Sequence, residues 1–237
     1  HLTTHAFFKA LLFLGAGSVI HAFSDEQDLR NMGGIWRKVP VTYVMMWIGS
    51  MALAGFPFFA GYYSKDMILE AAYAAQTGFG NFAFVMGCLA AFLTAFYSWR
   101  LLILAFHGTP RASADVMAHV HESPLVMTLP LLILAIGAIF SGWLGYELFV
   151  GLHWQKFWGE SLLILPTNTA MENAHHVPNW VKLLPIGLAA SGVAIAVLCY
   201  TVFTGLPAKI ATLFQPIYLF FLHKWYFDEL YDAMFVR

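Results

Sequence analysis

The sequence predicts an all-α fold, a polytopic bundle of transmembrane helices in which one helix is discontinuous. Of its 237 residues, 60% are hydrophobic and only 11% are charged, and the mean hydropathy is +0.69. A soluble domain carries about 25% charged residues, so this chain has fewer than half the usual share. Long apolar runs recur along the whole chain and leave little room for a separate soluble domain. The net charge of −1 argues against a nucleic-acid partner.

The first predicted span covers residues 1–22, and it ends at the polar loop "SDEQDLRNMGGIWRKVP". The apolar stretch that follows, residues 41–75, would be about 52 Å long as one straight helix, against a membrane core of about 30 Å. Gly55, Pro57 and Gly61 lie together at its centre. The pattern therefore predicts a broken helix, with halves near 41–55 and 62–76. Broken helices at membrane depth line cavities and often mark transport sites.

Three more spans are expected near residues 81–106, 125–149 and 183–204, which makes about five spans in all. The polar loop "HGTPRASADVMAHVHESP" separates the first two, and an aromatic-rich connection over 150–180 precedes the last. We therefore expect a transmembrane bundle over 1–204. Residues 205–237 mix apolar and charged side chains and are predicted to form an amphipathic, interfacial tail that leads toward a lateral helix.

Lysine and arginine residues predict the orientation. They are concentrated in the 22–40 loop, in and beside the 107–124 loop and in the tail, whereas the 77–81 turn has none and the 150–182 connection has two. Because short cytoplasmic loops carry the excess of positive charge, the first group is expected to face the cytoplasm. The first helix then runs from the outside inward.

A ladder of titratable groups occupies the first span. His1, His5 and Lys9 are each four residues apart, so they share one helix face. Lys9 lies 13 residues before the inner end, about 20 Å along the helix and near the middle of the core. An ammonium group buried there is costly, and its neutral form is favoured, so it can accept and release a proton. Histidine does so with little tuning. The alternative is that Lys9 snorkels or pairs structurally and that the histidines bond to carbonyls.

The second half of the broken helix begins with "GYYSKDMILE", where Ser64 is expected to cap the helix and Lys65 to open it. Irregular backbone beside Lys65 admits water, which favours a proton site there. Asp66 and Glu70 are secondary candidates. They are also explained as ordinary acids in the first turn of a helix, a reading that suits Asp66 better than Glu70.

Other chemistry finds no support in the sequence. Cys88 and Cys199 lie far apart in apolar runs, and no iron–sulfur, haem, P-loop or dinucleotide motif is present. His107, His119 and His121 share one loop, and we interpret them as solvent-facing histidines rather than metal ligands. We therefore expect no cofactor and no metal in this chain, so any redox step would belong to another chain.

Several stretches resemble a known family. "HLTTHAFFKALLFLGAGSVIHA", "DEQDLRNMGG" and "GFPFFAGYYSKDMILE" are similar to the antiporter-like membrane subunits of respiratory complex I, the NADH:quinone oxidoreductase. "YSKD" and the tail "KWYFDELYDAMFVR" bring the chain closest to the L-subunit group, known in mitochondria as chain 5. The resemblance covers essentially the whole chain and implies the second half of such a subunit, without the earlier half and the lateral helix.

The resemblance implies roles for these residues. Lys9 would lie on the hydrated axis of the membrane domain with His1 and His5, and Lys65 would be the terminal, outward-facing proton site. The chain would translocate protons in a bacterial inner membrane, next to another antiporter-like subunit. FMN, iron–sulfur clusters and quinone would be held by partner subunits, and electron transfer from NADH to quinone would drive the transport.

Three alternatives remain open at this point. A cation/proton antiporter subunit of the Mrp type would use the same lysines and the same broken helix, and so would a membrane subunit of a related hydrogenase. A purely structural membrane module is the third, but it leaves Lys9 at mid-membrane unexplained. The tail "YFDELYD" favours complex I over the Mrp type.

Overall fold

The computed structural model describes residues 1–165 and 167–236, and Pro166 and Arg237 lie outside the described residues. Within the described part the chain is helical and contains no strand, so the predicted all-α class is confirmed. The chain divides into two units, one over His1–Val197 and one from Leu198 onward. Among the described residues, four helices are long and apolar enough to cross a membrane: Leu2–Ala22, Gly78–Phe106, Leu125–Phe149 and Asn179–Val202.

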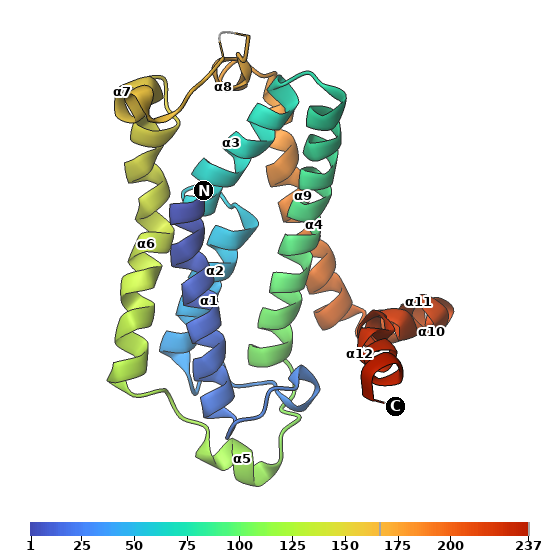
Figure 1. The fold of residues 1–237 in the computed structure, drawn as a ribbon. Helices are drawn as coiled ribbons and strands as arrows, with labels where there is room; N and C mark the ends of the chain where they lie inside the picture. The colour runs from blue at the N-terminus through green and yellow to red at the C-terminus, as the bar shows by residue number, and fades with distance from the viewer. Residues whose placement is uncertain (166, 237) are drawn as a thin grey trace. The chain divides into compact units, whose positions relative to one another are not determined.

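The first unit is a bundle of long helices joined by polar segments (Figure 1). Its main helices are α1 (Leu2–Ala22), α2 (Pro40–Ala54), α3 (Ala60–Ala74), α4 (Gly78–Phe106), α6 (Leu125–Phe149) and α9 (Asn179–Val197). The connections carry the short helices α5 (Ala114–His119), α7 (Trp154–Trp158) and α8 (Ala170–Ala174). Helix α1 packs on α2 and α6, and α4 packs on α2, α3 and α9.

The structure breaks the long apolar helix at the position that the sequence predicts. Helix α2 ends at Ala54, and Gly55 follows in the left-handed conformation with φ 78°. Phe58 also has a positive φ, 74°, so the backbone turns sharply before α3 begins at Ala60. Gly61 is required by packing, because a Cβ there would overlap the Ala52 carbonyl oxygen of α2. The broken helix that the sequence predicted is therefore confirmed, with two halves of 15 residues each.

The two loops that were predicted to lie on the same side of the membrane pack against each other. Arg111 donates to the carbonyls of Leu29 and Arg30 at 2.9 and 3.0 Å, and the Gly34 amide donates to the His107 carbonyl at 3.2 Å. These contacts join the 23–39 and 107–124 segments at the end of the bundle that carries α5 (Figure 1). Helices α7 and α8 lie at the opposite end.

A buried polar cluster closes the α5 end of the bundle. The Glu122 carboxylate accepts from the Val41 amide at 2.7 Å and from the Thr42 hydroxyl at 2.6 Å. Ser18 of α1 is hydrogen-bonded to Thr42 and to Ser123, both at 2.7 Å. Because α2 starts at Pro40, the carboxylate satisfies free amides at a helix N-terminus. This cluster ties α1, α2 and the 107–124 loop together.

The second unit consists of short helical pieces. A π-helical segment over Leu198–Val202 leads to α10 (Leu206–Leu213), α11 (Gln215–Leu222) and α12 (Phe227–Tyr231). Lys224, Trp225 and Tyr226 all have positive φ, which separates α11 from α12. Apolar side chains such as Leu213, Phe221 and Phe235 are exposed within this unit.

Candidate functional site

The ladder on α1 presents one face, as its spacing predicts. His1 and His5 have ring centroids 5.5 Å apart, and His5 packs edge-on against Phe8. The His1 Nδ1 lies 2.9 Å from the Ser64 hydroxyl of α3, which in turn lies 2.7 Å from the Thr4 hydroxyl. The start of α1 is therefore fastened to the second half of the broken helix.

Lys65 lies one and a half turns inside α3 rather than at its start. The expectation that Ser64 caps this helix is wrong, because α3 begins at Ala60 and Ser64 instead donates to the Ala60 carbonyl at 3.1 Å. The helix starts five residues earlier, at Ala60 instead of Lys65, because the chain has already turned at Phe58. The Lys65 Nζ reaches back and donates to the Ala54 carbonyl oxygen, the end of α2, at 2.6 Å.

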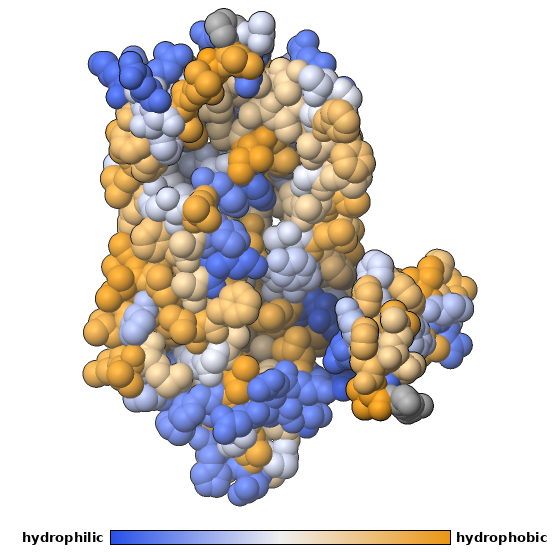
Figure 2. All heavy atoms as spheres, viewed as in Figure 1, coloured by the Kyte–Doolittle hydropathy of each residue, from blue (hydrophilic) through white to orange (hydrophobic). Residues whose placement is uncertain are grey.

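One cavity brings the four principal candidates together. It has a volume of about 340 Å³ and lies between α1, α2, α3 and α4. His1, His5, Lys9 and Lys65 all line it, with Thr94 and Tyr97 of α4 as further polar groups. Figure 2 shows hydrophilic residues at both ends of the bundle and in a strip within its apolar middle, where α1 begins in Figure 1.

Two further cavities continue this one along α1. A cavity of about 390 Å³ shares His1 with it and adds Thr4, Ser64 and Tyr146. A cavity of about 220 Å³ shares Lys9 with it and adds Ser50 and Ser98. A hydrated path along a helix needs adjoining cavities with polar groups where they meet. The three cavities along α1 have this arrangement.

The two secondary candidates lie away from the cavity. Asp66 is only 5% exposed, and its Oδ1 would lie 3.8 Å from a Cβ built on Gly55. It does not line the cavity. Neither of its carboxylate oxygens has a hydrogen-bond partner among the described residues. Glu70 is half-buried one turn further along α3, where it interacts electrostatically with Lys182 of α9. The structure therefore groups Asp66, and not Glu70, with Lys65.

The loop histidines do not gather around a metal position. The Nδ1 atoms of His119 and His121 face backbone carbonyls at 2.8 and 2.7 Å, and His107 Nε2 lies 3.0 Å from the Tyr43 hydroxyl. Among the described residues, no group of three or more His, Cys, Asp or Glu side chains is placed to hold a metal ion.

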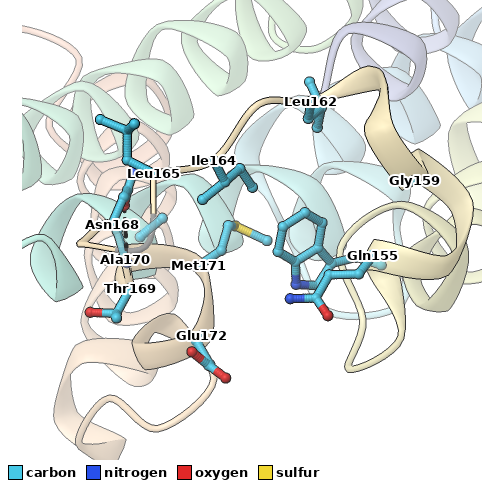
Figure 3. Close-up of a pocket in the computed structure, with 12 residues that line it drawn as sticks. Gln155, Gly159, Leu162, Ile164, Leu165, Asn168, Thr169, Ala170, Met171 and Glu172 are labelled. Carbon is cyan, nitrogen blue, oxygen red and sulfur yellow. Dashed lines mark hydrogen bonds between the residues drawn. The ribbon is translucent and has the colours of Figure 1, made fainter.

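A larger pocket, of about 430 Å³, is separate from these groups. Figure 3 shows labelled residues of α7, of α8 and of the described stretches 159–165 and 167–169 around it, and Ala71 of α3 also lines it. Of the described residues that line this pocket, Glu172 alone ionises. It is a feature of the connection between α6 and α9 and contains none of the predicted proton sites.

Sequence reasoning missed several groups at the site. Thr4, Thr94 and Tyr97 line the cavities but lack a charge that would single them out, and Ser64 was expected only as a helix cap. Thr94 and Tyr97 are three residues apart and so share a face of α4, a spacing that could have suggested them. The Ala54 carbonyl carries no sequence signal, because its role depends on where α2 ends.

The fold and the site define a class of protein: a polytopic membrane protein with a broken helix and two lysines on one internal cavity. Comparison with known proteins agrees with this class. The family described as "NADH:quinone oxidoreductase/Mrp antiporter, TM" matches residues 1–94.

Curated relatives extend the similarity to the whole chain. NADH-ubiquinone oxidoreductase chain 5 of Marchantia polymorpha is 45% identical over 100% of this chain and 36% of its own length. Chain 5 of Dictyostelium citrinum is 49% identical over 97% of this chain and 35% of its own. NADH-quinone oxidoreductase subunit L of Rhodobacter capsulatus is 38% identical over 100% of this chain and 42% of its own.

Residues 1–94 thus match that family, and the chain as a whole is similar to chain 5 and subunit L of NADH:quinone oxidoreductase. The resemblance predicted from the sequence is therefore confirmed. The chain spans little more than a third of the length of the curated relatives that it matches.

Proposed function

We propose that this chain translocates protons through the lysine and histidine groups that line one cavity and through water, as part of a membrane subunit of NADH:quinone oxidoreductase. The observation that carries the proposal is the single cavity lined by His1, His5, Lys9 and Lys65. Two lysines that face one cavity inside an apolar bundle have a cost in free energy, and a proton-transfer role accounts for them.

The arrangement supports transfer in steps. Lys9 lies at the junction of two cavities, so water on either side can exchange a proton with it. A proton that arrives at Lys9 adds a positive charge facing Lys65 across the cavity. At low effective dielectric constant such charges act on each other over several ångströms, so protonation of one lysine favours release from the other. Protons would then leave through the cavity that contains His1 and Ser64.

The redox chemistry would take place elsewhere in the assembly. We propose that this chain holds no redox centre and no cofactor, and that FMN, iron–sulfur clusters and quinone are bound by partner subunits. An adjacent antiporter-like subunit and membrane lipids would be its direct neighbours.

The protein is a membrane protein. The bacterial inner membrane is the location we predict.

A cation/proton antiporter subunit of the Mrp type is the second candidate, because the description of the matching family includes both systems. Relatives named as oxidoreductase subunits support the first candidate over it. Co-purification of the full-length subunit with quinone-reducing partners, rather than with antiporter partners, would decide between them.

The decisive experiment is proton pumping by the assembled complex in proteoliposomes, with the wild type compared with Lys65→Ala at matched rates of NADH oxidation. We expect the variant to assemble and to lose most of its pumping per NADH, because the cavity then keeps only one of its two lysines. Lys156→Ala is the matched control, since Lys156 is an exposed lysine in the α6–α9 connection. Normal pumping by an assembled Lys65→Ala complex would contradict the proposal.

A further inference from the structure

The Lys65 ammonium lies against a glycine at the break of the helix. Its Nζ donates to the Ala54 carbonyl oxygen at 2.6 Å, and Gly55 follows Ala54 immediately in the left-handed conformation. The Ala54 carbonyl belongs to the last turn of α2, where carbonyls lack partners within the helix. The carboxyl end of a helix also favours a positive charge. The end of α2 is thus a suitable resting place for an ammonium group.

The ammonium occupies the space that a side chain at Gly55 would need. A Cβ built on Gly55 would lie 2.5 Å from Lys65 Nζ and 2.8 Å from its Cε, with the Asp66 Oδ1 at 3.8 Å. The atoms that it would meet first are the end of a flexible side chain. The lysine would therefore move and the backbone would stay, so a side chain here displaces the ammonium from the Ala54 carbonyl.

We infer that Gly55 is a positioning residue for the proton site at Lys65: by lacking a Cβ it lets the ammonium rest on the Ala54 carbonyl at the end of α2. This inference rests on the proposed proton-transfer function. In this position the charge is held at the break of the helix, beside the cavity that also reaches Lys9. A proton passes to and from the Lys65 nitrogen, and no other bond is made or broken.

The titratable groups around Lys65 come from three helices. Asp66 is next to it on α3, Cys88 of α4 lies within electrostatic range of both, and Tyr97 of α4 lines the same cavity. His1, His5 and Lys9 of α1 face it across the cavity. A Gly55→Ala substitution changes none of these groups, so a change in pH dependence would report the displacement of the ammonium.

The chain offers a matched control for the backbone. Gly108 has φ 75°, almost the same as the 78° of Gly55, but a Cβ there would meet nothing within 4 Å. Gly108→Ala therefore imposes the same left-handed strain on alanine, without touching Lys65. Any difference between the two variants isolates the contact with the ammonium.

The experiment measures assembly, and pumping per NADH as a function of pH, for the full complex carrying Gly55→Ala, Gly108→Ala, Lys65→Ala or Gly55→Ala with Lys65→Ala. We expect Gly108→Ala to follow the wild type. In Gly55→Ala, the decline of pumping at alkaline pH should begin at a lower pH than in the wild type. The reason is that the displaced ammonium has lost its hydrogen-bond acceptor, the Ala54 carbonyl. In the Lys65→Ala background, Gly55→Ala should change nothing further.

Each outcome decides the inference. A Gly55→Ala profile that superimposes on that of Gly108→Ala would overturn it. If Gly55→Ala fails to assemble, the double variant decides: recovery of assembly supports the inference, because removal of Lys65 makes room for the Cβ, and continued failure overturns it. Normal pumping by Lys65→Ala would contradict the proposed function, while the comparison of assembly would still test the contact at Gly55.

Discussion

Lys9 and Lys65 face the same cavity from different surroundings. Lys65 donates to the Ala54 carbonyl, whereas the Lys9 Nζ lies 5.9 Å from the centre of the Phe13 ring. A hydrogen bond to a carbonyl holds an ammonium in one place more firmly than contact with an aromatic face does. At the scale of single residues, Lys65 is therefore the anchored site, and Lys9 is the site with freedom to turn between two cavities.

His107 provides a test of pH dependence outside the membrane-spanning helices. Partial burial lowers the pKa of His107 below its ordinary value of 6.5, so the fold favours the neutral ring. Its contribution to stability is complete above pH 6.5 and is lost as the pH falls below that value, because the unfolded chain then binds the proton more readily. We expect the thermal unfolding midpoint to fall between pH 7.5 and 5.5, and less steeply in His107→Phe.

Phenylalanine keeps the ring contacts of His107 with Trp36 and Tyr43 but cannot titrate. His153→Phe is the control, because His153 is exposed in the α6–α9 connection. If the unfolding midpoint of His107→Phe depends on pH as that of the wild type does, groups other than His107 cause the loss of stability at acid pH.

Among the elements, the broken helix depends on contacts at three places. Its first half is capped by Glu122, its break is turned by Gly55 and Phe58, and its second half is fastened to α1 through Ser64. Since Glu122 comes from a distant loop, the position of α2 depends on the 107–124 segment. The element that carries the proton site is thus held at the start of α2, at the break and in α3.

Removal of the Glu122 carboxylate should destabilise α2. In Glu122→Ala the Val41 amide and the buried Thr42 hydroxyl lose their acceptor, which costs about 1–3 kcal/mol of unfolding free energy. Glu122→Gln should cost less, because its amide oxygen can still accept. Thermal unfolding of the purified protein measures the difference, with Glu160→Ala at an exposed position as the control. An unfolding midpoint in Glu122→Ala equal to that of the control would refute the capping role.

For the whole molecule, small residues set how closely the helices approach. A Cβ at Gly142 would lie 2.6 Å from the Ala60 Cα, and one at Gly192 would lie 2.5 Å from the Phe92 carbonyl oxygen. In lipid, helices associate through close packing of this kind, because lipid tails are as apolar as the side chains. The pairs α3–α6 and α4–α9 therefore depend on glycine at the contact.

Helix α9 offers a matched pair of glycines to test this. At Gly187 a Cβ would meet nothing within 4 Å, so Gly187→Ala should stabilise the helix by about 0.5–1 kcal/mol through helix propensity alone. Gly192→Ala has the same propensity gain but forces α9 away from α4, and overpacking of this kind costs about 1–3 kcal/mol. Thermal unfolding of the two variants should therefore shift in opposite directions. A shift in the same direction would mean that α4 and α9 can separate without cost.

Much of the fold follows from local pattern. Apolar runs bounded by polar loops locate α1, α4 and α6 to within a few residues, whereas α9 begins four residues before the predicted span and ends seven residues before the end of that span. Glycine and proline at the centre of a run that is too long to be one span locate the break between α2 and α3. The spacing of four residues places His1, His5 and Lys9 on one face. The start of α3 was misplaced because the turn uses Phe58, a residue with no turn preference.

The sequence by itself determined that this is a membrane-spanning helical bundle with lysines inside its apolar stretches, because composition and helical periodicity are local properties of the chain. Only the tertiary structure decided that Lys9 and Lys65, 56 positions apart, line one cavity, and that neither Asp66 nor Glu70 lines it. It alone assigned an acceptor to the Lys65 ammonium, the Ala54 carbonyl. Those relations depend on where α2 ends and on how α1 packs beside α3, and contacts between distant segments leave no periodic signal in the sequence.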